Sequence, residues 1–172
     1  VKTLPTGRGP HELVVTSDGR WAVSTDYSGG DSLTVFDVAE PRVVRTIDLS
    51  AYSRPHGILL MPDEETVVVT SEATGNLLLV NFIEGKILFA IETEQEGSHM
   101  VALSADGKHA YTSNMGSDTV SIIDIAEGEF LRAISVPDRP EAITTNAVGD
   151  EIWVGSNDEG KVSVVDAATG EI

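Results

Sequence analysis

Three histidines and one glutamate occupy the same position in four similar stretches of the sequence, and a polar residue closes the hairpin that follows each of them. The first set is His11, His56, His99 and Glu141. The second set is Asp26, Glu72, Asn114 and Asn157. Neutral imidazoles and carboxylates are ligands for zinc, copper or nickel ions, and a histidine beside a carboxylate can act as a general base. The pattern therefore predicts a site for a polar ligand or a divalent metal, or a catalytic site. In the metal interpretation the ligands are His11, His56 and His99.

The geometry of each hairpin determines whether the residue at its start lies opposite the polar residue that closes it. The tight Asp-Gly turn of the first stretch places His11 opposite Asp26, and that of the third stretch places His99 opposite Asn114. The other two pairs are looser expectations, because the second turn is longer and the fourth is offset by one residue. A carboxylate beside His56 would raise its pKa, since a negative charge favours the imidazolium form.

Three arginines recur just before these stretches and could clamp an anionic ligand at the same place. They are Arg8, Arg54 and Arg139. Ion pairs with the neighbouring carboxylates explain the arginines equally well. A hydrogen bond from each histidine to a neighbouring carbonyl would likewise explain the histidines without any ligand. Both alternatives stay open at the level of sequence.

The residues above belong to four repeats of about 40–45 residues, a spacing typical of propeller blades. The repeats cover residues 6–49, 53–92, 96–136 and 138–172. Each consists of short β-branched runs separated by Gly- and Asp-rich turns, and none shows a helical period. We therefore predict one all-β domain over residues 1–172, a β-propeller with four antiparallel blades of four strands. In this fold the first strands line the central channel, so the polar pairs should meet at one mouth of it.

The two ends of the sequence match in register, since the last repeat lacks a fourth strand and residues 1–5 resemble one. Val1–Leu4 could complete the last blade in a closed ring of four. Two chains could instead form an eight-bladed homodimer. The third interpretation, which we favour, is that the four blades are part of a larger ring of about seven, with residues 1–5 as the outer strand of a preceding blade.

The stretch "AYTSNMGSDTVSIIDIAEGEFLRAISVPDRPEAI" from Ala110 resembles the YVTN repeat of bacterial and archaeal β-propellers. Tyr111, Thr112 and Asn114 match the motif that names the repeat, while the other copies are looser. The resemblance implies a propeller that is usually seven-bladed, and it slightly favours a periplasmic or extracellular location. The wider group includes lactonase-like, surface-layer and cytochrome-d1-like propellers, so it implies no single activity.

The amino-acid composition excludes several classes of binding partner. The formal net charge of −17 disfavours nucleic acid and anionic lipid surfaces. Without cysteine there can be neither disulfides nor thiolate metal sites. We find no apolar run of the about 20 residues that span a membrane, and no signal peptide, so membrane insertion is not expected. The binding partners that stay compatible with this composition are a small molecule, a divalent metal and another protein.

Two functions follow from these observations. The first is a binding scaffold that presents a polar histidine and carboxylate mouth to a small ligand, a metal or a protein. The alternative is an enzyme of the lactonase or lyase type that uses a metal or a histidine base at the same mouth. A haem-associated propeller is a third idea, and the absence of a Cys-x-x-Cys-His motif counts against it.

Overall fold

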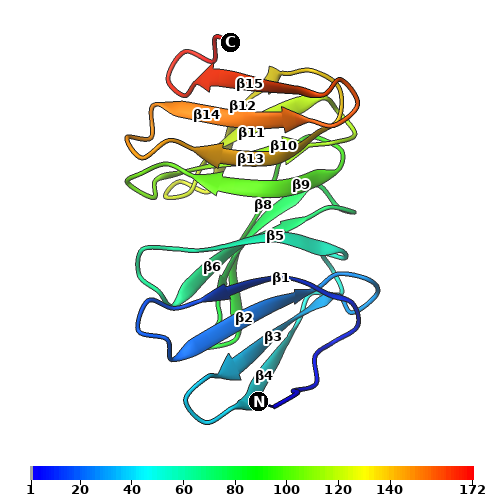
Figure 1. Cartoon of the computed structure of the whole chain (residues 1–172), viewed down its shortest axis with the longest axis vertical. Helices are drawn as coiled ribbons and strands as arrows, with labels where there is room; N and C mark the ends of the chain where they lie inside the picture. Colours follow the sequence, from blue (N-terminus) through cyan, green and yellow to red (C-terminus); the bar gives the residue numbers. More distant parts are fainter. Residues whose placement is uncertain (1) are drawn as a thin grey trace.

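The computed structural model describes residues 2–172 as four antiparallel β-sheets that follow one another in chain order. The first three sheets have four strands each and the fourth has three, so each repeat forms one blade of a β-propeller (Figure 1). The described residues form no helix, and therefore none long and apolar enough to cross a membrane. The predicted all-β propeller fold is confirmed.

Each blade consists of consecutive strands joined by short turns. The first blade contains β1 (Pro10–Val15), β2 (Trp21–Asp26), β3 (Ser32–Asp37) and β4 (Arg42–Asp48). The second contains β5 (Pro55–Leu60), β6 (Thr66–Ser71), β7 (Asn76–Asn81) and β8 (Lys86–Glu92). The third contains β9 (Ser98–Leu103), β10 (His109–Asn114), β11 (Thr119–Asp124) and β12 (Glu129–Ser135). The fourth contains β13 (Pro140–Thr145), β14 (Glu151–Ser156) and β15 (Lys161–Asp166).

The core lies between neighbouring blades. One buried cluster joins the first two blades, a second joins the second and third, and a third joins the last two. Strand β6 shows why: Val67 and Val69 pack toward the first blade, whereas Val68 packs toward the third. Successive side chains of a strand point to opposite faces, so a run of β-branched residues supplies both interfaces at once.

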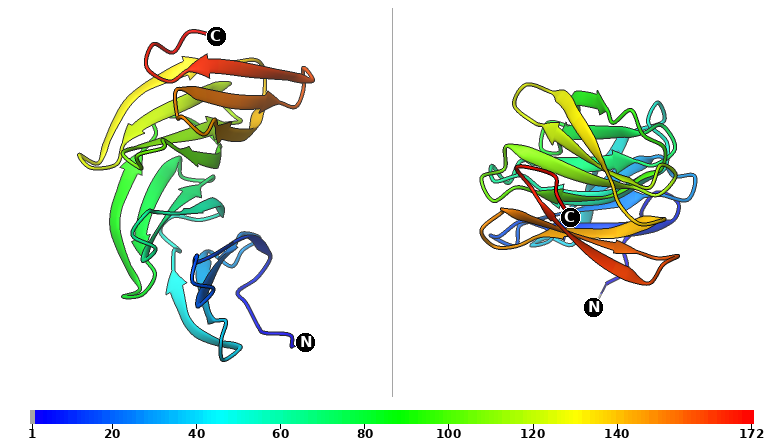
Figure 2. Two further views of the ribbon diagram at one scale, coloured as in Figure 1. Left: turned by 60° about the vertical axis from the view of Figure 1, so that its left-hand side comes forward. Right: turned by 90° about the horizontal axis from the view of Figure 1, so that it is seen from above.

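The blades are arranged in an open arc, and the first strands β1, β5, β9 and β13 lie side by side along its concave edge (Figure 2). The two termini lie at opposite ends of the arc. The prediction that Val1–Leu4 forms an outer β-strand, of a preceding or the last blade, is wrong for residues 2–4, which form no strand; Val1 lies outside the described residues. Instead, the Lys2 ammonium donates a hydrogen bond to the Pro41 carbonyl of the first blade, at 2.7 Å.

A β-bulge near the start of the first strand recurs in every blade and changes the predicted register. Leu13 lies opposite Ser24, but Pro10 lies opposite Asp26, so β1 contains an extra residue between these two pairs. The prediction that His11 faces Asp26 is therefore wrong. The third blade behaves in the same way, because Ser98 rather than His99 lies opposite Asn114. A bulge re-aims side chains and bends the strand, which here turns the histidines out of the hairpin ladder.

Hydroxyl side chains hold these bulges and tie each blade to the next. They belong to Thr25, Thr70 and Ser113, one on the second strand of each of the first three blades. The Thr25 hydroxyl accepts the Glu12 N–H at 3.1 Å and donates to the His56 carbonyl of the next blade at 3.2 Å. Since each of the three hydroxyls makes both contacts, successive inner strands are held in the same relative position.

Candidate functional site

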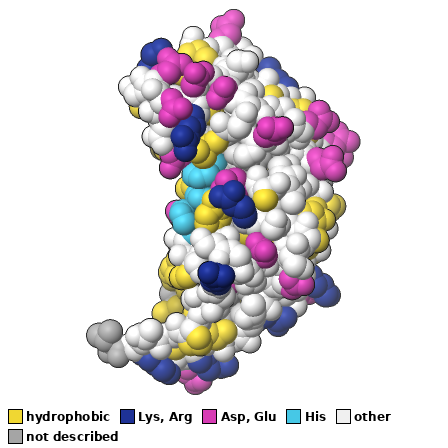
Figure 3. Space-filling view, turned by 90° about the vertical axis from the view of Figure 1, so that its right-hand side faces the viewer, with side chains coloured by type: hydrophobic (Ala, Val, Ile, Leu, Met, Phe, Trp, Pro, Cys, Tyr) yellow, Lys and Arg dark blue, Asp and Glu magenta, His cyan; other side chains and the backbone are white. Residues whose placement is uncertain are grey.

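The three predicted histidines come together as a stack of imidazole rings on the concave edge. The ring centroids of His11 and His56 are 4.2 Å apart, and those of His56 and His99 are 3.7 Å apart. Tyr27 packs edge-on against His56 at 4.8 Å. Figure 3 shows histidine side chains gathered in the middle of this edge. Neighbouring strands β1, β5 and β9 each contribute one ring, so the stack follows from the repeat.

We use the term mouth for this stack together with the polar side chains around it. The mouth comprises His11, Tyr27, Arg54, His56, Glu72, His99, Glu141 and Asn157. Within it, one ring nitrogen of His56, one of His99 and a carboxylate oxygen of Glu72 lie within 4.8 Å of one another. His11, which the sequence predicted as the third metal ligand, is not part of this group. It stacks on the outer side of His56 instead.

Glu72 is held by two neighbours. Its Oε1 is 3.1 Å from an Arg54 guanidinium nitrogen, and its Oε2 accepts a hydrogen bond from the Tyr27 hydroxyl at 2.8 Å. The Arg54 guanidinium lies over the Tyr27 ring, 4.7 Å from its centroid, and also contacts the Tyr27 hydroxyl. We call this arrangement of Arg54, Tyr27 and Glu72 the latch.

The imidazoles of His56 and His99 are buried and their Nδ1 atoms have no hydrogen-bond partner in the described structure. Burial lowers the pKa of His56 to about 3, assisted by the positive charges that His99, His11 and Arg54 can carry. The prediction of a raised pKa for His56 is wrong for this reason. Burial also lowers the pKa of His99, although the charges of Glu72 and Glu141 oppose it. Both rings are therefore neutral near pH 7 and offer a lone pair to a metal or a donor.

The predicted partners divide into two groups. Asp26 and Asn114, which the tight turns assigned to the mouth, are fully buried inside their blades. Asp26 Oδ2 accepts hydrogen bonds from Ser32 at 2.7 Å and Thr34 at 2.8 Å, while its Oδ1 has no partner. The looser predictions, Glu72 and Asn157, are the ones that reach the mouth. They stand one residue beyond the buried position, where Tyr27 stands in the first blade.

The last blade completes the mouth differently. The Asn157 amide donates a hydrogen bond to the Glu141 carboxylate. Arg139 pairs with Asp158 at 3.8 Å rather than with either of these residues. Arg8 is exposed and is not equivalent to the other two arginines, because Gly9 occupies their position and its carbonyl accepts the Tyr27 N–H. Of the three predicted arginines, only Arg54 contacts a carboxylate of the mouth.

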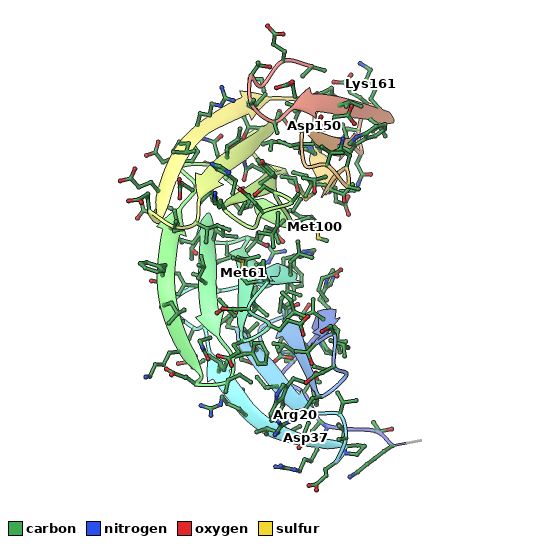
Figure 4. The ribbon with its side chains drawn as sticks, turned by 90° about the vertical axis from the view of Figure 1, so that its left-hand side faces the viewer. Arg20, Asp37, Met61, Met100, Asp150 and Lys161 are labelled. Atoms are coloured by element: carbon green, nitrogen blue, oxygen red, sulfur yellow. The ribbon has the colours of Figure 1, made fainter. Side chains whose placement is uncertain are left out.

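An open pocket of about 450 Å³ extends from the histidine stack to the last blade. The residues that line it include the three histidines of the stack, Glu12, Glu141, Met100 and Lys161. Figure 4 shows Met100 on the inner side of the arc and Lys161 on the last blade. Sequence reasoning missed Tyr27, Glu12 and Met100. Tyr27 could have been found by aligning the residue that follows the second strand in each repeat.

Comparison with known proteins supports the fold and leaves the activity open. No family model matches the chain, so the resemblance to the YVTN repeat stays a prediction. Uncharacterized proteins from two strains of Staphylococcus epidermidis are each 26% identical over 181 residues, covering 94% of this chain and 52% of the relative. A hydrazine synthase structure from Kuenenia stuttgartiensis matches 99% of this chain and 49% of its own, with a TM-score of 0.87 and 20% identity. The chain thus spans about half the length of the curated relatives it matches, and the structural likeness concerns the propeller fold.

Proposed function

We propose that the chain is a β-propeller binding scaffold that holds a divalent transition-metal ion at its mouth, with His56, His99 and Glu72 as ligands. The observation that carries the proposal is a pair of buried imidazoles, each with an unpartnered Nδ1, whose rings each bring a nitrogen close to a Glu72 carboxylate oxygen. Buried polar atoms are rarely left without a partner, and each one is expected to have an explanation. Two imidazoles and one carboxylate form a ligand set used for zinc, with a fourth position left to water or another ligand.

Binding requires a small rearrangement. Tetrahedral zinc, with ligand distances of about 2.0–2.2 Å, brings its ligand atoms to roughly 3.3 Å from one another. The three ligand atoms here lie within 4.8 Å, so the rings must turn and Glu72 must leave part of the latch. The buried imidazoles are neutral near pH 7 and lose no proton on binding.

Zinc titration by calorimetry, after chelator treatment, tests the proposal. We expect His99→Ala and Glu72→Gln to weaken zinc binding by about 10-fold to 100-fold, as is usual for the loss of a ligand or of its support. His11→Ala is the matched control, since His11 belongs to the stack but not to the ligand group, and it should retain affinity within about threefold. Absence of saturable zinc binding, or equal losses in all three variants, would contradict the proposal.

The pocket beside the ligand group favours one second function, an enzyme of the lactonase or lyase type. A metal with an open position can polarise a carbonyl or activate water, and the pocket has room for a substrate next to His99. Hydrolysis of a panel of lactones by the zinc-loaded protein tests this function. Turnover that His99→Ala abolishes would support it, and turnover that survives the substitution would assign the activity elsewhere.

A further inference from the structure

We propose that the pocket between the histidine stack and the last blade binds an organic cation with N–H donors, a guanidinium or a primary amine. This site does not depend on the metal proposal, although it overlaps the proposed metal site at His56 and His99. Its acidic groups come from both ends of the arc, with Glu12 on β1 and Glu141 on β13. A volume of about 450 Å³ is within the range of small-molecule sites.

The first argument is that two carboxylates of the pocket have no lysine or arginine partner within the described part of the chain. Among residues 2–172, neither Glu12 nor Glu141 forms an ion pair with a lysine or an arginine. Glu12 lies 3.7 Å from the His11 ring, and Glu141 receives only the neutral Asn157 amide. Both residues line the pocket, so a cation bound there would have two carboxylates within the same site that no described lysine or arginine pairs with.

The second argument is independent of the carboxylates. His56 and His99 also line the pocket, and they are only 4% and 8% exposed, with unpartnered Nδ1 atoms. In a neutral imidazole one ring nitrogen carries the proton and the other is an acceptor, so each of these rings can accept one hydrogen bond from an N–H donor, and Nδ1 is the acceptor when the proton is on Nε2. A carboxylate or a phosphate could not use the acceptor nitrogens and would be repelled by the two glutamates.

The third argument is the latch itself, which shows the binding mode within the same mouth. There a guanidinium lies 4.7 Å from an aromatic centroid and 3.1 Å from a carboxylate oxygen. The pocket is lined by residues of the same kinds, an aromatic ring in His99 and a carboxylate in Glu141, and the lysine that lines it is Lys161. The nearest ammonium, that of Lys161, is paired with Glu159. Contact of a cation with an aromatic face and a carboxylate is a favourable combination.

The experiment is a calorimetric titration of the chelator-treated, metal-free protein with agmatine, which carries a guanidinium and a primary amine. 1-Butanol serves as the uncharged probe. We expect saturable agmatine binding, no butanol binding, and a loss of about tenfold in Glu141→Gln. Glu127→Gln removes the same charge from an exposed turn far along the third blade and should change the affinity less than twofold. Equal losses in the two variants, or equal binding of both probes, would overturn the site and leave only general attraction to an acidic protein.

Zinc separates this inference from the metal proposal. If both are correct, saturating zinc should weaken agmatine binding, because the two ligands need the same imidazole nitrogens. Agmatine binding that zinc does not affect would overturn the role assigned to the histidines here. Zinc binding with no agmatine binding would overturn this inference alone, and agmatine binding with no zinc binding would overturn the metal proposal alone.

Discussion

The two arginines that precede β5 and β13 occupy the same place in their repeats but do different things. Arg54 and Arg139 have the same left-handed backbone conformation, with φ of 59° and 56°. Each carbonyl accepts the N–H of the residue that follows the second strand of its own blade. Arg54 then turns onto Tyr27 and Glu72, whereas Arg139 pairs with the exposed Asp158.

The difference lies in the neighbours. At the positions of Tyr27 and Glu72, the third and fourth blades carry Met115 and Asn157, which offer neither a phenol nor a charge. The position of an arginine in a repeat therefore does not determine its role. The aromatic and acidic side chains nearby determine it. Where they are present, at Tyr27 and Glu72, the mouth holds the guanidinium of Arg54; where they are absent, the carboxylate of Glu141 has no lysine or arginine partner among residues 2–172.

The largest expected effect comes from removing the arginine of the latch. In Arg54→Met, Glu72 no longer has to give up its ion pair with Arg54 when it turns toward a metal. A partly exposed ion pair contributes up to about 1 kcal/mol, so we expect zinc affinity to rise about fivefold. Calorimetric zinc titration measures the change.

Arg139→Met is the matched control, because it removes the same side chain from the same backbone conformation without touching Glu72. Its zinc affinity should stay within about twofold of the parent chain. If the two variants change affinity equally, the effect comes from net charge and the latch has no part in it.

The propeller could be predicted from the repeats because every level of the sequence agrees. Runs such as Thr66–Ser71 are β-branched and are buried on both faces, which suits a strand between two neighbouring blades. The structure of residues 2–5 could not be predicted in the same way. Their likeness to an outer strand is real, but pairing also needs a partner edge, and the fourth blade lies at the other end of the arc.

The mouth was predicted in part, and the bulge explains the rest. Turn geometry alone sets a register that holds from Val15 back to Leu13 and fails before His11. Because side chains alternate with a period of two, one extra residue exchanges the buried and exposed sets. His11 therefore no longer lies opposite Asp26, which is buried in its blade, and the next residue, Tyr27, packs against the histidines. The sequence of a single hairpin does not reveal the bulge. Comparison of the repeats does offer a signal, because a hydroxyl residue at Thr25, Thr70 and Ser113 accepts a backbone N–H of the bulged strand in three blades.

The histidine stack should make the stability of the metal-free protein fall in mild acid. The pKa of His56 is about 3 in the folded chain, below its ordinary value of 6.5. Between these values the unfolded chain binds the additional proton, so the free energy of unfolding is fully retained above pH 6.5 and decreases as the pH falls toward 3. From pH 7 to pH 5.5 we expect a loss of about 1 kcal/mol from His56.

Urea unfolding of the parent chain and of His56→Gln at the two pH values, with chelator present, measures this contribution. The loss between pH 7 and pH 5.5 should be smaller in the variant by about 1 kcal/mol. An equal loss in both proteins would show that His56 takes up its proton in the folded state as readily as in the unfolded chain.

The smallest effect is expected when the partners of the latch are introduced beside Arg139, at the last blade. Met115→Tyr combined with Asn157→Glu supplies the partners that Arg139 lacks, and its guanidinium should then turn toward the pocket. The cation of the chain would compete with an added amine at a partly exposed pair, so agmatine affinity should fall about threefold. Adding Arg139→Met to this double variant should reverse the sign, because the new carboxylate then remains unpaired beside Glu141 and agmatine should bind more tightly than in the parent chain. Calorimetry on the three proteins distinguishes these results, and a triple variant that binds as weakly as the double variant would show that Arg139 never entered the pocket.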